Sequence, residues 1–132
     1  MYILFIRSVT EYCAVVFHSS LNKQQTQKIE QIQKTCLKII LGDMYMDYHT
    51  SLEICGLKTL ERRRQDRMLN FSLKSIKHPQ NKRIFPRNEK HEHNIREREP
   101  FKVNFANTEN YRTSAVPSCQ RALNTHFLTK NI

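Results

Sequence analysis

Apolar residues recur at helical spacing through the first 78 residues of this 132-residue chain. Within residues 2–17 they return every three or four positions, at Phe5, Val9, Tyr12 and Val16. The same period continues from about Lys23 to Leu41, with one stripe formed by Ile29, Ile32, Cys36 and Ile40. We therefore predict two amphipathic helices, each of which buries one apolar face.

Capping residues indicate where these helices and two later ones begin and end. Gly42 and Gly56 stand where a helix C-terminus favours positive φ, so they end the long helix and a short one over residues 48–55. Thr59 is the expected N-cap of a further helix that runs to about Lys77. Pro79 stops that helix because proline cannot continue the hydrogen-bond pattern.

The helical period is lost after Pro79. Four prolines interrupt this part of the chain, and residues 87–99 are a mixed-charge run without an apolar stripe. Residues 79–132 hold 16 hydrophobic residues among 54, against 35 among 78 in residues 1–78. Because so little apolar surface can be buried, we expect residues 79–132 to form a largely irregular linker and tail, with a short last helix around residues 118–127.

These patterns predict a mainly α fold. We expect a small bundle of three to four helices in residues 1–78, followed by an irregular basic C-terminal tail. The chain has only two glycines, which disfavours a turn-rich β-architecture. The alternation of Phe101, Val103 and Phe105 resembles a strand but is too short to build a sheet.

The positive charge is concentrated in one stretch of the chain. The net charge is +10, and residues 58–83 supply +7 of it, with nine basic and two acidic side chains. A focused cationic patch beside a neutral apolar part is typical of proteins that bind polyanions. The candidate nucleic-acid-binding residues are Lys58, Arg62, Arg63, Arg64, Arg67, Lys74 and Lys77.

The alternative is that these cations have no binding role and form a solvated helix face. Their position favours binding, because arginines in the first turn of a helix oppose its dipole at a cost of about 0.3–1 kcal/mol each. A sequence selected only for helix stability would place acidic residues there. The hypothesis requires the arginines to project outward together as one positive surface.

No set of residues indicates catalysis or a cofactor. Asp43 and Asp47 lie in a turn after a helix, where aspartate is favoured for local hydrogen bonds. His91 and His93 form only one close-spaced pair, whereas a structural zinc site needs four ligands. The four cysteines have no C-x-x-C spacing, and we expect them to be reduced thiols. We predict no catalytic residue, no metal and no cofactor.

The chain resembles, in order along nearly its whole length, the C-terminal region of non-LTR retrotransposon reverse transcriptases. The similar phrases are residues 6–12 (IRSVTEY), 32–34 (IQK) leading to 37–42 (LKIILG), 57–63 (LKTLERR), 84–86 (IFP), and 114–117 (SAVP) followed by 120–124 (QRALN). Two positions depart from the family pattern: Phe17 stands in place of a tryptophan, and Lys58 in place of a proline. The resemblance implies a thumb and the sequence after it.

In that family of RNA-directed DNA polymerases, the thumb is a helical module that packs on the palm and holds the template–primer duplex. The polymerase carboxylates belong to the palm and have no counterpart here, so the resemblance implies a non-catalytic fragment of this transposable-element enzyme. It also implies that the apolar helix of residues 1–17 meets a missing palm domain or another protein. A degenerate, non-functional reading frame would give the same pattern.

We therefore expect non-specific binding of nucleic-acid backbone, with RNA or an RNA–DNA duplex as the partner. The alternative is a protein-interaction helical module in which the charge only confers solubility. Arg7 and Glu11 interrupt the apolar start, which indicates neither a signal peptide nor a membrane span. We expect no membrane partner and an intracellular location, nuclear or cytoplasmic.

Overall fold

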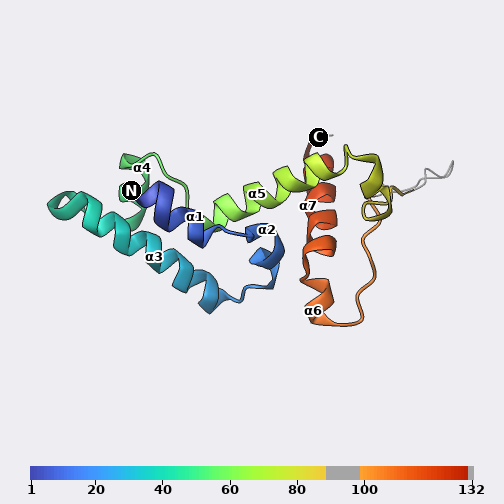
Figure 1. The fold of residues 1–132 in the computed structure, drawn as a ribbon, viewed down its shortest axis with the longest axis horizontal. Coiled ribbons are helices and arrows are strands. Elements are labelled where there is room, and N and C mark those ends of the chain that lie inside the picture. Colours follow the sequence, from blue (N-terminus) through green and yellow to red (C-terminus); the bar gives the residue numbers. More distant parts are fainter. Residues whose placement is uncertain (89–98, 131–132) are drawn as a thin grey trace. The chain divides into compact units, whose positions relative to one another are not determined.

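A computed structural model of the chain describes residues 1–88 and 99–130 (Figure 1). The chain divides into two units. The first unit contains Met1–Ala14 and Leu21–Asp66, and the second contains Val15–Ser20 and Arg67–Ile132. The division expected at residue 78 is therefore replaced by one between Asp66 and Arg67.

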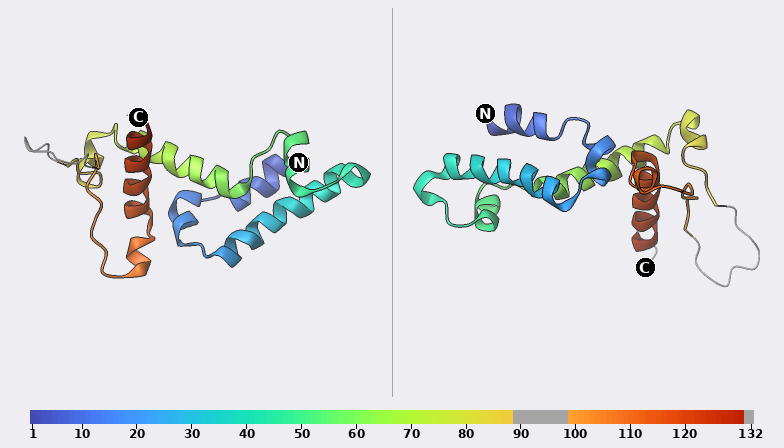
Figure 2. Two further views of the ribbon diagram at one scale, coloured as in Figure 1. Left: turned by 180° about the vertical axis from the view of Figure 1, so that it is seen from behind. Right: turned by 90° about the horizontal axis from the view of Figure 1, so that it is seen from below.

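The first unit is helical. A π-helical turn η1 (Tyr2–Ile6) continues into α1 (Arg7–Thr10), and the long helix α3 spans Lys23–Leu41. The 3₁₀ turn η3 (Gly42–Met44) then reverses the chain into α4 (Tyr48–Ile54), which packs against α3 (Figure 2). The unit ends with the first turns of α5 (Leu60–Ser75).

Local sequence signals predict α3 and its neighbours well. The bounds of α3 agree with the predicted helix, and it begins with a capping box in which the Asn22 side chain accepts from Gln25 N–H (2.8 Å) and Gln25 Oε1 accepts from Asn22 N–H (2.9 Å). Gly42 and Gly56 have φ of 51° and 60°, which confirms both as helix-ending residues. The predicted short helix is present as α4.

The predicted single helix over residues 2–17 is wrong. It breaks at Cys13, whose φ is 52°, and resumes as α2 (Ala14–Phe17). Within the first unit, Phe5, Val9 and Tyr12 of the expected core stripe are 63%, 75% and 76% exposed. Tyr2 and Glu11 are buried in their place because both bind polar groups of the unit.

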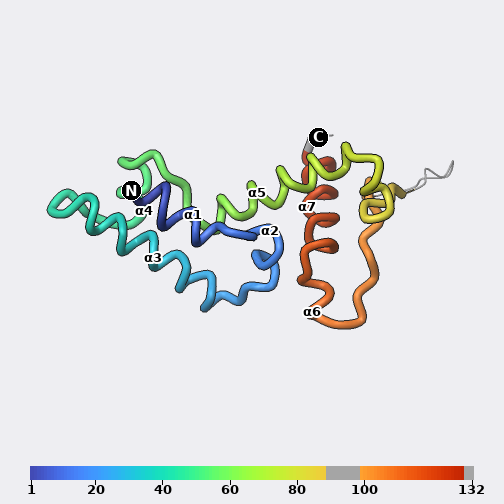
Figure 3. The backbone as a smooth tube through the Cα atoms, viewed as in Figure 1, coloured from blue at the N-terminus to red at the C-terminus, as the bar shows by residue number. Residues whose placement is uncertain are grey.

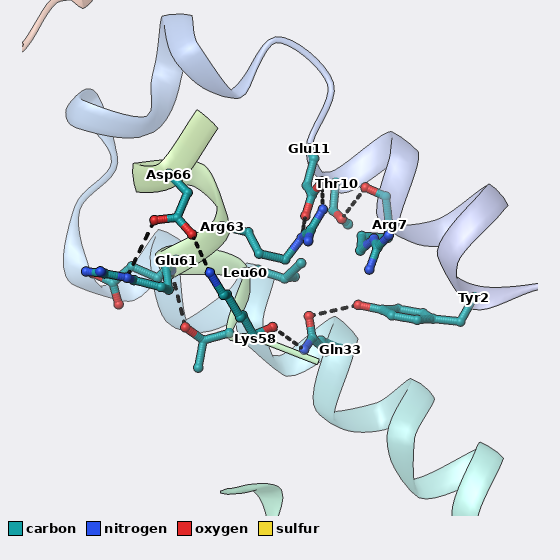
Figure 4. A network of polar contacts seen from close by, with 12 residues as sticks. Tyr2, Arg7, Thr10, Glu11, Gln33, Lys58, Leu60, Glu61, Arg63 and Asp66 are labelled. Carbon is teal, nitrogen blue, oxygen red and sulfur yellow. Dashed lines mark hydrogen bonds and ion pairs between the residues drawn. The ribbon is translucent and has the colours of Figure 1, made fainter. Parts of the chain in front are cut away.

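A buried glutamine ties three segments of the first unit together (Figure 4). Gln33 of α3 accepts a hydrogen bond from the Tyr2 hydroxyl (2.8 Å) and donates one to the Lys58 carbonyl (3.1 Å). Both hydrogen-bonding ends of its amide are thereby satisfied, which makes its burial tolerable. Burial raises the pKa of Tyr2 to about 12.

Because the pKa of Tyr2 is raised, we expect the chain to lose stability at alkaline pH. The folded chain holds the Tyr2 proton more tightly than the unfolded chain, whose tyrosine pKa is about 10. The stabilisation is therefore complete below pH 10 and is lost as the pH rises toward 12, by about 1 kcal/mol per pH unit. Burial also raises the pKa of Tyr48, which acts in the same direction.

Urea unfolding between pH 8 and 11.5 measures this effect. Tyr2→Phe should lower stability at neutral pH, because Gln33 loses a partner, and should flatten the alkaline decline. The control is Tyr12→Phe, since Tyr12 is exposed and should change neither quantity. An unchanged alkaline slope in Tyr2→Phe would contradict the buried position of this phenol.

The second unit contains the C-terminal half of α5 and everything described after it. Its other elements are most of α2, η2 (His18–Ser20), η4 (Pro79–Arg83), α6 (Glu109–Arg112) and α7 (Ala115–Lys130). An isolated antiparallel bridge joins Arg87 to Phe101. The chain then runs without helical turns to α6 (Figure 3).

The buried core of this unit comes from residues 79–132, where we expected too little apolar surface to be buried. Phe85, Phe101, Cys119 and Leu123 are buried together, and five half-buried side chains pack against them: Val15, Met68, Leu73, Ile76 and Phe127. The predicted short last helix is present and longer, as the 16-residue α7 (Figure 2). The described parts of residues 79–132 therefore pack into a core that we did not expect, and their last helix is longer than predicted.

Two buried amides on α7 hold the non-helical backbone. Asn124 accepts from Phe101 N–H (2.8 Å) and donates to the Phe101 carbonyl (2.9 Å). One turn earlier, Gln120 accepts from Asn104 N–H (2.9 Å) and donates to the Ile84 carbonyl (2.6 Å). These side chains take the place of a neighbouring strand, which is why so short an extended segment can be ordered.

The fold class is confirmed: the part of the chain that the structure describes is mainly helical, as a small helical bundle, and has no strand beyond the single bridge.

Candidate nucleic-acid interface

Two side chains cap the N-terminus of α5, where the first candidate arginines lie. Thr59 Oγ1 accepts a hydrogen bond from Arg62 N–H (3.2 Å), which confirms Thr59 as the N-cap. The Glu30 carboxylate of α3 accepts from the N–H groups of Leu60 (3.0 Å) and Glu61 (3.3 Å). Because this carboxylate offsets the helix dipole, the first-turn arginines no longer argue for a binding role.

Lys58 and Arg62 share the carboxylate of Asp66, and Figure 4 shows the bond from Lys58. Lys58 Nζ lies 2.8 Å from Asp66 Oδ2, and Arg62 Nε lies 3.6 Å from Asp66 Oδ1. The hydrogen bond from Lys58 lowers the pKa of the Asp66 carboxyl. Both cations are exposed, but the shared carboxylate reduces the positive potential that they present to a polyanion.

Arg63 points into the first unit. Its Nε donates to Glu11 Oε1, and its Nη2 donates to Glu11 Oε2 at 3.1 Å (Figure 4). This bidentate hydrogen bond raises the pKa of Arg63. The Glu11 side chain is almost fully buried, so the pair joins α5 to the N-terminal segment. Arg63 is thus engaged by the protein itself.

Arg64 contradicts the prediction most directly, because its exposed fraction is 0%. Its Nε, Nη1 and Nη2 atoms have no hydrogen-bond partner among the described residues. Burial lowers the pKa of this guanidinium. A side chain sealed in this way cannot contact a phosphate, so the inclusion of Arg64 in the binding site is wrong.

The remaining candidates, Arg67, Lys74 and Lys77, belong to the second unit, and all three are exposed. Lys74 and Lys77 form no ion pair with a described residue. The prediction that all arginines of this helix project outward is therefore wrong for Arg63 and Arg64, whereas Arg62, Arg67, Lys74 and Lys77 are exposed.

Among its described residues, the second unit also exposes five cations that were not among the candidates. They are Lys82, Arg83, Arg87, Lys102 and Arg112, and the last of these is paired with Glu109. Counted from the sequence, the first unit holds nine basic and seven acidic residues, whereas the second holds thirteen and five. The net charges are thus +2 and +8. The positive excess in residues 58–83 was visible in the sequence, but only the fold divides it into +2 in the first unit and +5 in the second.

Described residues of the second unit line two pockets. One, of about 510 Å³, is lined by Ile76, Asn81, Lys82, Phe85, Arg87 and Phe101. The other, of about 320 Å³, is almost entirely apolar and is lined by Val15, Val16, Phe71, Ser75, Asn81, Ile84, Phe85, Ala115, Val116 and Cys119. Of these two pockets, the larger one combines apolar walls with the cationic side chains of Lys82 and Arg87.

The described residues contain no cluster of three or more side chains suited to a metal ion. Asp47 accepts from the N–H groups of His49 (2.9 Å) and Thr50 (3.3 Å) and so acts as the N-cap of α4. His91 and His93 lie outside the described residues. Burial in the core raises the pKa of Cys119. Over the two described ranges, no helix combines the length and apolar character needed to span a bilayer.

Comparison with known proteins identifies no relative: no protein-family model matches the chain, and no curated protein or solved structure matches it significantly.

Proposed function

We propose that this chain binds the phosphate backbone of nucleic acid, without catalysis and without sequence specificity, through the exposed cations of the second unit. The observation that carries the proposal is the distribution of charge. The second unit has a net charge of +8, and the described part of it contains only two acidic residues, Glu99 and Glu109. Glu109 is already paired with Arg112.

The binding surface proposed here follows the chain from the middle of α5 into η4. It contains Arg67, Lys74, Lys77, Lys82 and Arg83, all of which are exposed. Lysine and arginine side chains at such positions replace the counterions of a phosphate backbone, and the release of those ions supplies the affinity. Contacts of this kind position a nucleic acid but do not read its sequence.

The proposal agrees with what the resemblance to the thumb region of non-LTR retrotransposon reverse transcriptases implies. On that hypothesis the chain is part of an RNA-directed DNA polymerase, and its partner is RNA or an RNA–DNA duplex. The genomic sequence upstream of the reading frame tests this assignment. An in-frame palm with paired aspartates would support it, and an unrelated sequence would remove its basis.

The binding test is a salt titration by fluorescence anisotropy with labelled duplex RNA, an RNA–DNA hybrid and single-stranded RNA. Replacing Lys74, Lys77, Lys82 and Arg83 by glutamine should lower the affinity for all three. The slope of log affinity against log salt should become shallower by about 1 for each lost phosphate contact.

The matched control replaces Lys23, Lys28, Lys34 and Lys38 of α3 by glutamine, which removes the same formal charge from the first unit. It should retain most of the affinity and of the salt slope. If both quadruple variants lose affinity equally, the binding reflects net charge alone and the proposed surface is incorrect.

A specific observation favours a second function, that of a protein-interaction module. In the N-terminal segment Leu4, Phe5, Val9 and Tyr12 are exposed together. Contiguous exposed apolar side chains are typical of interaction sites. Absence of salt-dependent binding to any of the three nucleic acids, together with cross-linking of residues 1–17 to a protein, would replace the first proposal by this one.

A further inference from the structure

The larger pocket of the second unit has an apolar floor. Phe85 and Phe101 belong to the unit's buried core, and their exposed fractions are only 7% and 3%. Ile76, near the end of α5, adds a third apolar wall. A volume of about 510 Å³ lies within the range of roughly 300–1,000 Å³ that is usual for small-molecule sites.

Backbone hydrogen bonds hold the walls of this pocket. On either side of the Arg87–Phe101 bridge, Lys102 N–H donates to the Pro86 carbonyl (2.9 Å) and Asn88 N–H donates to the Pro100 carbonyl (3.0 Å). Asn124 of α7 fixes the backbone of Phe101 from the other side. The pocket is therefore formed by the fold itself before any ligand binds.

The polar groups of the pocket suit an anionic ligand with a flat ring. Lys82 and Arg87 supply exposed cations. The Arg87 guanidinium carbon lies 6.0 Å from the centre of the Phe101 ring, which places the cation directly beside the apolar floor. The Asn81 side-chain amide donates a hydrogen bond from Nδ2 to the Ser75 carbonyl (3.2 Å), and the Asn81 Oδ1 atom can accept one from a ligand.

We propose that this pocket holds one unpaired nucleobase of a bound nucleic acid, while Lys82 and Arg87 bind the phosphates next to it. The inference rests on the proposed function and adds a preference for strands that contain an unpaired nucleotide. Aromatic and aliphatic side chains bind the face of any base, and flanking cations follow the backbone, which is the usual division of roles in single-strand binding. The smaller pocket has no such cations and carries no equivalent site.

The test compares two RNA duplexes of equal charge. One contains a single bulged adenosine, and the other contains an abasic residue at the same position. The wild-type chain should bind the adenosine bulge about tenfold more tightly, because only that duplex offers a base to the apolar floor. Equal affinity for the two duplexes would overturn the proposal.

Two double variants test whether this pocket causes the preference for the adenosine bulge. Lys82→Gln combined with Arg87→Gln should remove most of the preference for the adenosine bulge. Lys74→Gln combined with Lys77→Gln removes the same charge outside the pocket and should weaken binding of both duplexes while keeping their ratio. If the Lys82 and Arg87 variant keeps the full preference, the base binds elsewhere.

A measurement on the free ligand separates this proposal from the general one. Adenosine monophosphate should shift the NMR signals of the Ile76 methyl groups and the Arg87 side chain, and inorganic phosphate should leave the Ile76 signals unchanged. Equal shifts with both ligands would reduce the pocket to an anion site, and no shift would exclude it. These NMR measurements do not depend on binding of a long nucleic acid. If the chain bound no long nucleic acid, only the proposed function would be refuted.

Discussion

Replacing Leu123 by alanine is expected to lower the free energy of unfolding of the second unit by about 2–5 kcal/mol. Leu123 has an exposed fraction of 0% and lies on α7 among Phe85, Phe101 and Cys119. The substitution removes apolar contacts and leaves a cavity that the surrounding rings cannot fill without moving. Because few other large apolar side chains support this core, we expect a cost toward the upper part of that range.

Urea unfolding followed by circular dichroism measures the loss, and hydrogen exchange of the α7 amides localises it. Thr125→Ala on the same helix is the matched control, since Thr125 is exposed and its hydroxyl donates to the Arg121 carbonyl one turn earlier. That change should stay within about 0.5 kcal/mol. A cost below 1 kcal/mol for Leu123→Ala would mean that residues 79–132 form no packed core.

Replacing Arg64 by methionine is expected to raise the stability of the first unit by about 1–4 kcal/mol. The guanidinium is removed from water, and none of its three nitrogens has a hydrogen-bond partner among the described residues. Methionine keeps an unbranched chain of comparable reach and carries no charge to desolvate. The same variant should leave the affinity for nucleic acid unchanged, although the sequence placed Arg64 among the binding residues.

The control is Arg62→Met, two positions earlier on the same helix. Arg62 is exposed and only 3.6 Å from the shared Asp66 carboxylate, so its replacement should alter stability by less than about 1 kcal/mol. A loss of stability in Arg64→Met would show that the guanidinium has a partner. A loss of nucleic-acid affinity in that variant would restore Arg64 to the binding site.

Several elements followed from local signals in the sequence. The capping box at Asn22, the positive φ of Gly42 and Gly56 and the cap at Thr59 each depend on residues within a few positions of one another. Helices α3, α4 and α5 were predictable for this reason, as was the mainly helical class. The concentration of positive charge in residues 58–83 is equally a property of the sequence alone.

The partners of individual side chains could not be predicted, because they come from distant parts of the chain. The amphipathic stripe of residues 2–17 predicted the wrong buried face, since Glu11 turns inward to meet Arg63, 52 positions away. On α3, the buried side chains include Gln33, whose partners are Tyr2 and Lys58. The spacing of hydrophobic residues cannot predict a buried polar contact of this kind.

The sequence by itself determined the main helices, their caps and the net positive charge, because short-range hydrogen bonds and composition decide those features. Only the tertiary structure decided which cations remain available. In the folded chain, Lys58 and Arg62 form ion pairs with Asp66, and Arg63 forms one with Glu11. Arg64 is buried, whereas Lys74 and Lys77 are exposed. The physical reason is that the availability of a charge depends on the nearest opposite charge and on water, and folding sets both.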